Sequence, residues 1–189
     1  MRATVVRLLA LSTLFGAAAC DGDGPGPSRL TLQEVSGVYR VCTLRFLPQN
    51  SAFPAANLLE RVIDTTPPPG KLEPTVTLFA DRPEYQLAYT RSDAASQDFR
   101  SSVSFTGDQV LLRFYTDDDS RGQVPSELLL PRDVRLDFQN SPKRLSTSAS
   151  RIYSVSRRDY ARAAGVEESG FAPTIPGSLD ISLREGSCS

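Results

Sequence analysis

Apolar and polar residues alternate with a period of two through much of the chain. In the segment 85–91, for example, Tyr85, Leu87 and Tyr89 fall on one face. This period, in runs rich in β-branched and aromatic residues, is typical of half-buried β-strands. The other runs of this kind are 38–46, 75–80, 99–105, 110–115, 127–131, 133–138, 144–155 and 178–183.

Two of these runs form a hairpin signal. Gly107 and Asp108 separate the runs 99–105 and 110–115, and a Gly-Asp pair between two alternating segments predicts a tight β-turn. The remaining runs follow one another at about ten-residue spacing with short links, which is typical of an antiparallel sandwich or barrel. Because a closed barrel leaves no exposed sheet edge, we expect an all-β, up-and-down barrel of about eight to ten strands.

The first run and residues 53–65 lead to two further predictions. Strict alternation in the first run places one set of side chains on a single face: Val38, Arg40, Cys42, Leu44 and Phe46. Residues 53–65 fit a helical stripe and a strand equally well, so both interpretations stay open there.

One short helix is expected near residues 156–164. Ser156 is a typical N-cap, the sequence RRDYARAA follows it, and Gly165 is a typical helix stop. The three signals agree on both ends of the helix.

The first residues have the pattern of a secretory signal. Arg2 and Arg7 are basic, an apolar run follows, and Ala17 to Ala19 are small. A membrane-spanning helix needs about 20 apolar residues and this run is only about 12 long, so we do not expect it to remain as a transmembrane anchor. The prediction is a signal peptide over residues 1–19.

The sequence Ala17-Ala-Ala-Cys20 resembles a bacterial lipobox. This resemblance implies that Cys20 becomes the mature N-terminus and carries acyl chains, which anchor the protein to a membrane of the cell envelope, facing the periplasm or the cell surface. The alternative is an ordinary cleaved signal, with Cys20 uninvolved. We interpret residues 20–36 as the lipidated cysteine and a flexible tether, and residues 37–189 as one barrel domain.

Two cysteines remain once Cys20 is set aside. An even number in an exported chain favours pairing, and Cys42 lies in the first strand-like run while Cys188 follows the last one. We predict a Cys42–Cys188 disulfide; two free thiols are the alternative.

The composition of the chain excludes several kinds of catalytic and metal site. The chain has no histidine, which rules out a Ser-His-Asp triad and a His-rich zinc site. Its formal net charge of −1 argues against nucleic acid as a partner. We expect no catalytic residue, metal or cofactor. The basic stretch 151–165 either meets anionic lipid headgroups or is a short helix with solvated charges, and we favour the helix.

The run that begins at Gly37 and Tyr39, the meander of hairpins and the closing strand 175–183 together resemble small bacterial lipoproteins with a lipocalin-like barrel. That resemblance implies pairing of the first and last strands, and a small apolar or amphiphilic ligand. The alternative is a filled barrel that acts as a structural or protein-interaction module of the envelope. The residues expected to line a ligand cavity are aromatic: Phe79, Tyr85, Tyr89, Phe99, Phe105, Phe114 and Phe138.

Overall fold

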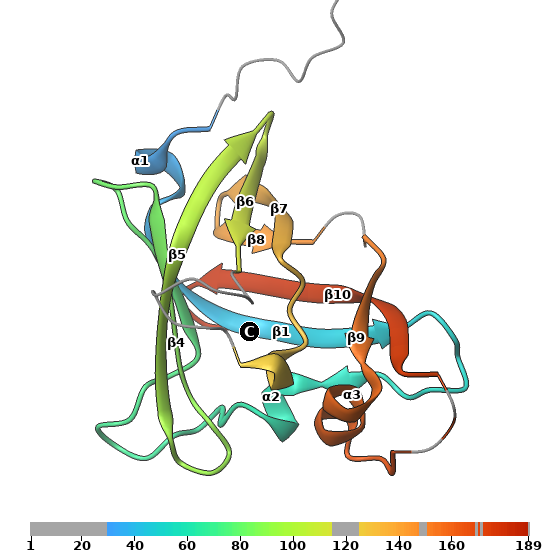
Figure 1. Ribbon diagram of the computed structural model, residues 1–189. Coiled ribbons are helices and arrows are strands. Elements are labelled where there is room, and N and C mark those ends of the chain that lie inside the picture. The colour runs from blue at the N-terminus through green and yellow to red at the C-terminus, as the bar shows by residue number, and fades with distance from the viewer. Residues whose placement is uncertain (1–29, 115–124, 148–150, 169, 171, 189) are drawn as a thin grey trace, which may run out of the picture.

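Eight antiparallel strands close into a barrel in the computed structural model, which describes residues 30–114, 125–147, 151–168, 170 and 172–188 (Figure 1). The barrel order is β1-β3-β4-β5-β6-β7-β8-β10, and pairing of β1 with β10 closes it. These strands are β1 (Gly37–Pro48), β3 (Thr75–Leu78), β4 (Glu84–Thr90), β5 (Ser96–Thr106), β6 (Gln109–Arg113), β7 (Asp133–Asn140), β8 (Lys143–Ser146) and β10 (Thr174–Glu185). The predicted all-β up-and-down barrel is confirmed, and its architecture is consistent with a lipocalin-like fold.

Two short strands extend the sheet beyond the barrel. β2 (Ala56–Asn57) pairs with β1, and β9 (Tyr153–Ser156) pairs with β10. The run 144–155 is therefore not the single strand that its pattern predicts. Its two ends, β8 and β9, pair with different parts of β10.

The seam between β1 and β10 is the longest pairing of the barrel, running from Tyr39–Glu185 to Pro48–Gly177. Gly177 is required in this seam, because a Cβ there would overlap the ring of Phe46 and the carbonyl oxygen of Leu47. The predicted pairing of first and last strands is thus confirmed.

A β-bulge changes the face pattern of β1. The register shifts between Val41 and Thr43, so Tyr39 and Val41 point inward before the bulge and Leu44 and Phe46 after it. Strict alternation had placed Arg40 on the face of Leu44 and Phe46, and that assignment is wrong. The extra residue of a bulge reverses the alternation.

The helices gather at the two ends of the barrel. α3 (Arg157–Ala164) begins at the N-cap Ser156 and ends at Gly165, which is in the left-handed conformation, so the predicted helix is confirmed. α3 lies beside α2 (Leu58–Arg61) and η1 (Ser126–Leu128) at one end of the barrel (Figure 1). The run 127–131 is thus partly 3-10 helix rather than strand, and residues 53–65 contain both β2 and α2.

The folded domain begins before Gly37. α1 (Leu32–Val35) has a capping box in which Thr31 and Glu34 each accept a hydrogen bond from the other's backbone N–H, and Val35 is fully buried in the core. Residues 31–35 are therefore part of the domain and not of a flexible tether. The predicted signal peptide, Cys20 and the start of the tether lie outside the described residues.

Candidate functional site

Three of the predicted cavity aromatics pack against one another inside the barrel. The ring centroids of Tyr85 and Phe114 are 5.5 Å apart in an edge-on arrangement, and Phe99 stacks on Phe114 at 6.5 Å. The Tyr85 hydroxyl donates to the Arg113 carbonyl oxygen at 2.9 Å. These are contacts of the kind that aromatic side chains make in a packed core.

The other four predicted aromatics do not join this cluster of rings. Tyr89 is fully buried, whereas Phe105 and Phe138 are half-buried and pack at the edge of the core. Phe79 lies just beyond β3, with the Arg82 guanidinium 4.0 Å above its ring, while Val76 and Leu78 are the buried residues of that strand. The inward assignment of Phe79 is therefore wrong.

A second aromatic cluster lies at the α3 end of the barrel and was not predicted. Tyr160 packs edge-on against Phe46 at 6.0 Å and Phe53 at 5.9 Å, and Tyr153 packs on Phe46 at 5.5 Å. The spacing of Tyr160 with Ala163 and Ala164 on the predicted helix is a one-face signal that points to this packing.

The barrel wall has an opening where β8 ends. β8 pairs with β7 only over Asp137–Asn140 and with β10 only over Ser182–Arg184. Among the residues that the structure describes, no strand lies between β7 and β10 beyond Ser146. We call this opening the β7–β10 slit; it has a volume of about 120 Å³ and is lined by Leu111, Pro131, Asp133, Val134, Arg135, Thr147, Arg151, Tyr153 and Leu179.

The slit combines an apolar floor with residues from the outer face of the barrel. Val134 and Leu179 are buried and belong to the inner face, whereas Leu111 is half-buried on the outer face opposite Arg135. The volume is close to that of an engineered cavity of about 150 Å³ that binds benzene, and below the range of about 300–1,000 Å³ usual for whole small ligands. The slit thus has room for a ring or the end of an apolar chain.

A more polar hollow of about 310 Å³ adjoins the slit and shares Pro131 and Tyr153 with it. Its further lining includes the polar residues Ser154, Ser156 and Asp159. Tyr153 lines both spaces, and its hydroxyl donates to the Leu129 carbonyl oxygen at 2.5 Å. Burial raises the pKa of Tyr153, so the phenol stays a neutral donor around neutral pH.

Exposed arginines surround both spaces. Arg135 and Arg151 border the slit and Arg132 borders the hollow, and none of the three makes an ion pair among the described residues. The carboxylates nearby are engaged: Asp133 pairs with Arg113 at 3.2 Å, and Asp159 accepts from Ser156 at 2.7 Å. The rim therefore carries uncompensated positive charge.

None of the seven predicted aromatics lines the slit or the hollow, nor a third pocket between Phe53 and α3. The sequence identified the core but not these openings. The slit arises from the early end of β8, and only the strand register reveals where a wall strand stops short.

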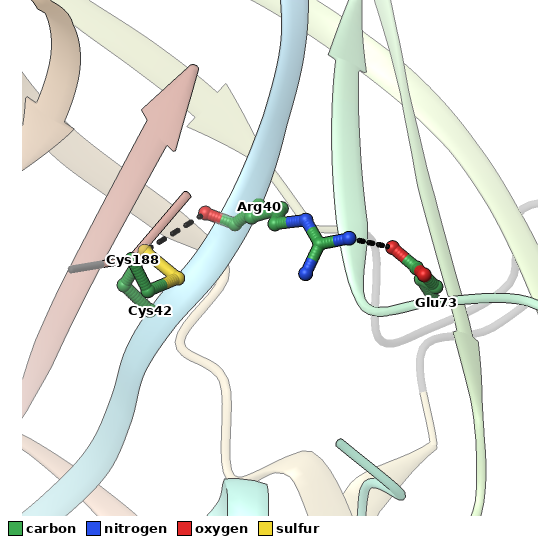
Figure 2. Close-up of a disulfide and its surroundings, with 4 residues drawn as sticks. All are labelled: Arg40, Cys42, Glu73 and Cys188. Atoms are coloured by element: carbon green, nitrogen blue, oxygen red, sulfur yellow. Dashed lines mark hydrogen bonds and ion pairs between the residues drawn. A yellow bond between two sulfur atoms is a disulfide. The ribbon is translucent and has the colours of Figure 1, made fainter. Parts of the chain in front are cut away.

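The predicted disulfide is present between Cys42 and Cys188, whose Cα atoms are 5.3 Å apart (Figure 2). Cys42 is the bulged residue of β1, which turns its side chain to the outer face. Gly186, with φ of +86°, turns the chain after β10 so that Cys188 reaches it. Arg40, close by on β1, pairs with Glu73 at 2.5 Å (Figure 2).

The basic stretch 151–165 is partly engaged within the protein. Arg157 donates to the Ala172 carbonyl oxygen and lies over the Phe53 ring, and Arg162 is 3.9 Å from Asp159. Over the described ranges, no group of three or more histidine, cysteine or carboxylate side chains has the arrangement of a metal site. No helix in those same ranges has the length and hydrophobicity needed to cross a bilayer.

No family model, curated protein or solved structure with which the chain was compared matches it. The site is therefore interpreted from its own geometry.

Proposed function

We propose that this protein is a non-catalytic lipoprotein of the cell envelope, anchored through acyl chains on Cys20, and that its lipocalin-like barrel binds the apolar part of a small anionic amphiphile in the β7–β10 slit. The observation that carries the ligand proposal is the slit itself, with its apolar floor and its rim of arginines without ion pairs. The adjoining polar hollow would accommodate the headgroup of such a molecule.

The ligand would thus bind in the barrel wall, and not in the barrel interior where the sequence predicts it. Tyr85, Phe99 and Phe114 are in mutual contact and fill the space between them. An apolar chain seated between Val134 and Leu179 would instead displace water from a wall that is already open. Burial of apolar surface there would supply affinity, at about 0.8 kcal/mol per CH₂.

The same packed interior supports a second candidate, a structural or protein-interaction module without a small ligand. The two candidates share the lipid anchor and differ only in whether the slit is occupied. The lipid anchor and ligand binding in the slit can therefore be tested in separate experiments.

The anchor is tested with Cys20→Ala. We expect the protein to move from the membrane fraction to the soluble fraction, because stable anchoring requires two or more acyl chains. Mass spectrometry of the mature wild-type protein should place those chains on Cys20, and Ser28→Ala, in the predicted tether, should stay with the membrane. An unmodified Cys20 in membrane-purified protein would refute the anchor.

The slit is tested by titrating the mature chain, residues 20–189, bearing Cys20→Ser with dodecanoate. We expect saturable binding that Leu111→Trp weakens about tenfold, the effect of denying burial to about two methylene groups. Leu47→Trp places the same ring on a half-buried position of β1 that does not line the slit, and should change little. No saturable binding, or equal losses in both variants, would favour the module without a ligand.

A further inference from the structure

Three arginines lie side by side across three neighbouring strands on the outside of the barrel. Arg40 of β1 is directly opposite Arg184 of β10, and Arg184 is directly opposite Arg144 of β8. Side chains of directly opposite residues point to the same face with Cβ atoms about 5 Å apart. The strands that carry this arginine row lie one beside the next in the barrel wall (Figure 1).

This arrangement is unfavourable for the isolated barrel. Like charges directly opposite each other destabilise a β-sheet pair. Glu73 compensates Arg40 and Arg184 also has an interaction within the protein, but Arg144 is exposed and makes no ion pair with any residue that the structure describes. Anionic groups from outside the protein would neutralise the positive charge of such a surface.

Further residues at the same end of the barrel fit an anionic surface. Lys143, next to Arg144, donates to the carbonyl oxygen of Ser36, which immediately precedes β1. Val38 precedes Arg40 on the same face of β1 and is 55% exposed. The carboxylates of this face have other partners: Glu73 pairs with Arg40, and Asp137, diagonal to Arg144 on β7, accepts a hydrogen bond from Gln109 at 2.7 Å.

The arginine row also lies where the N-terminal segment joins the barrel. α1 leads into β1 at this end, and Ser36 contacts the β7–β8 hairpin through Lys143. Only nine residues lie between Cys20 and Leu30, so even a fully extended link of ten Cα–Cα steps spans no more than about 35 Å. A barrel anchored at Cys20 is therefore held with this end within reach of the bilayer.

We propose that the arginine row forms a membrane-facing surface that binds anionic phospholipid headgroups, so that α3, the slit and the hollow stay accessible to the surrounding aqueous phase. The proposal rests on the anchor for its location, but the binding itself needs no acyl chain. Basic residues near a bilayer surface attract anionic lipids, with an effect that falls off within a Debye length.

The test is flotation of the mature chain, residues 20–189, bearing Cys20→Ser with phospholipid vesicles. We expect binding to vesicles that contain phosphatidylglycerol and none to phosphatidylcholine alone, with loss of binding at high salt. Arg144→Gln should weaken the partition about fivefold, the effect of one cation at a bilayer surface. Arg100→Gln removes the same charge from an exposed position on β5 and should leave the partition unchanged.

The possible outcomes of these experiments test the membrane-facing surface and distinguish it from the slit and from the anchor. Equal losses in Arg144→Gln and Arg100→Gln, or no preference for phosphatidylglycerol, would overturn the membrane-facing surface. Competition by free glycerol phosphate at low concentration would also overturn it, in favour of a soluble phosphate ligand. Leu111→Trp should leave vesicle binding unchanged, which separates this surface from the slit, and mass analysis of Cys20 separates it from the anchor.

Discussion

Replacing both Cys42 and Cys188 with serine is expected to lower the free energy of unfolding by about 5 kcal/mol. The disulfide joins residues 146 positions apart, so it closes a loop that contains most of the chain. In the loop-entropy description, a crosslink of this span removes conformational freedom from the unfolded chain worth on the order of 5 kcal/mol. Urea unfolding of the oxidised protein and of the double variant measures the difference.

The native barrel itself should change little in the double variant. The β1–β10 seam is paired along its length by backbone hydrogen bonds, and the disulfide lies on its outer face. Wild-type protein unfolded under reducing conditions is the control and should match the double variant. A loss below about 1 kcal/mol would mean that the unfolded chain keeps the two ends close without the crosslink.

The pairing of the chain's two ends was predictable from sequence because two independent signals agreed on it. Cys42 and Cys188 were the thiols left after Cys20 was assigned to the anchor, and the resemblance to lipocalin-like proteins joined the same two runs. The turn at Gly107 and the helix between Ser156 and Gly165 were also predictable from the sequence. In the turn and the helix, short-range chemistry alone decides the structure.

Other features depended on contacts that no local pattern records. The bulge at Cys42 reverses the faces of β1, and its position is set by the partner strand β10. The run 127–131 is rich in leucine like a buried strand, yet Leu128 and Leu129 are buried in and after a 3-10 turn at the α3 end of the barrel. Tertiary packing overrides strand propensity there.

The candidate site was the least predictable part. The aromatic residues were correctly expected to point inward in most cases, but side-chain size alone does not distinguish a filled core from a ligand cavity. The slit depends on where β8 ends relative to both of its neighbours. The arginine row depends on the register of β1, β10 and β8, which brings together residues up to 144 positions apart in the sequence.

Replacing Phe99 with alanine is expected to cost about 3–5 kcal/mol of stability. Phe99 is buried, stacks on Phe114 and lies 6.3 Å from the Tyr85 ring, so its removal leaves a cavity that the remaining rings cannot fill. Phe79→Ala is the matched control. Its half-exposed ring contacts Arg82 rather than the core, and we expect a loss of about 1 kcal/mol or less. Thermal or urea unfolding measures both variants.

This comparison also decides where a ligand can bind. If the barrel interior is a packed core, Phe99→Ala creates an apolar cavity that was absent before, and benzene should partly restore its stability as it does for engineered cavities. Dodecanoate binding at the slit should persist in the folded variant, because Phe99 does not line the slit. A small loss of stability, together with a large change in dodecanoate affinity, would place the ligand among the aromatics instead. The packing of three rings would then be the closed state of a ligand chamber, and the slit its opening.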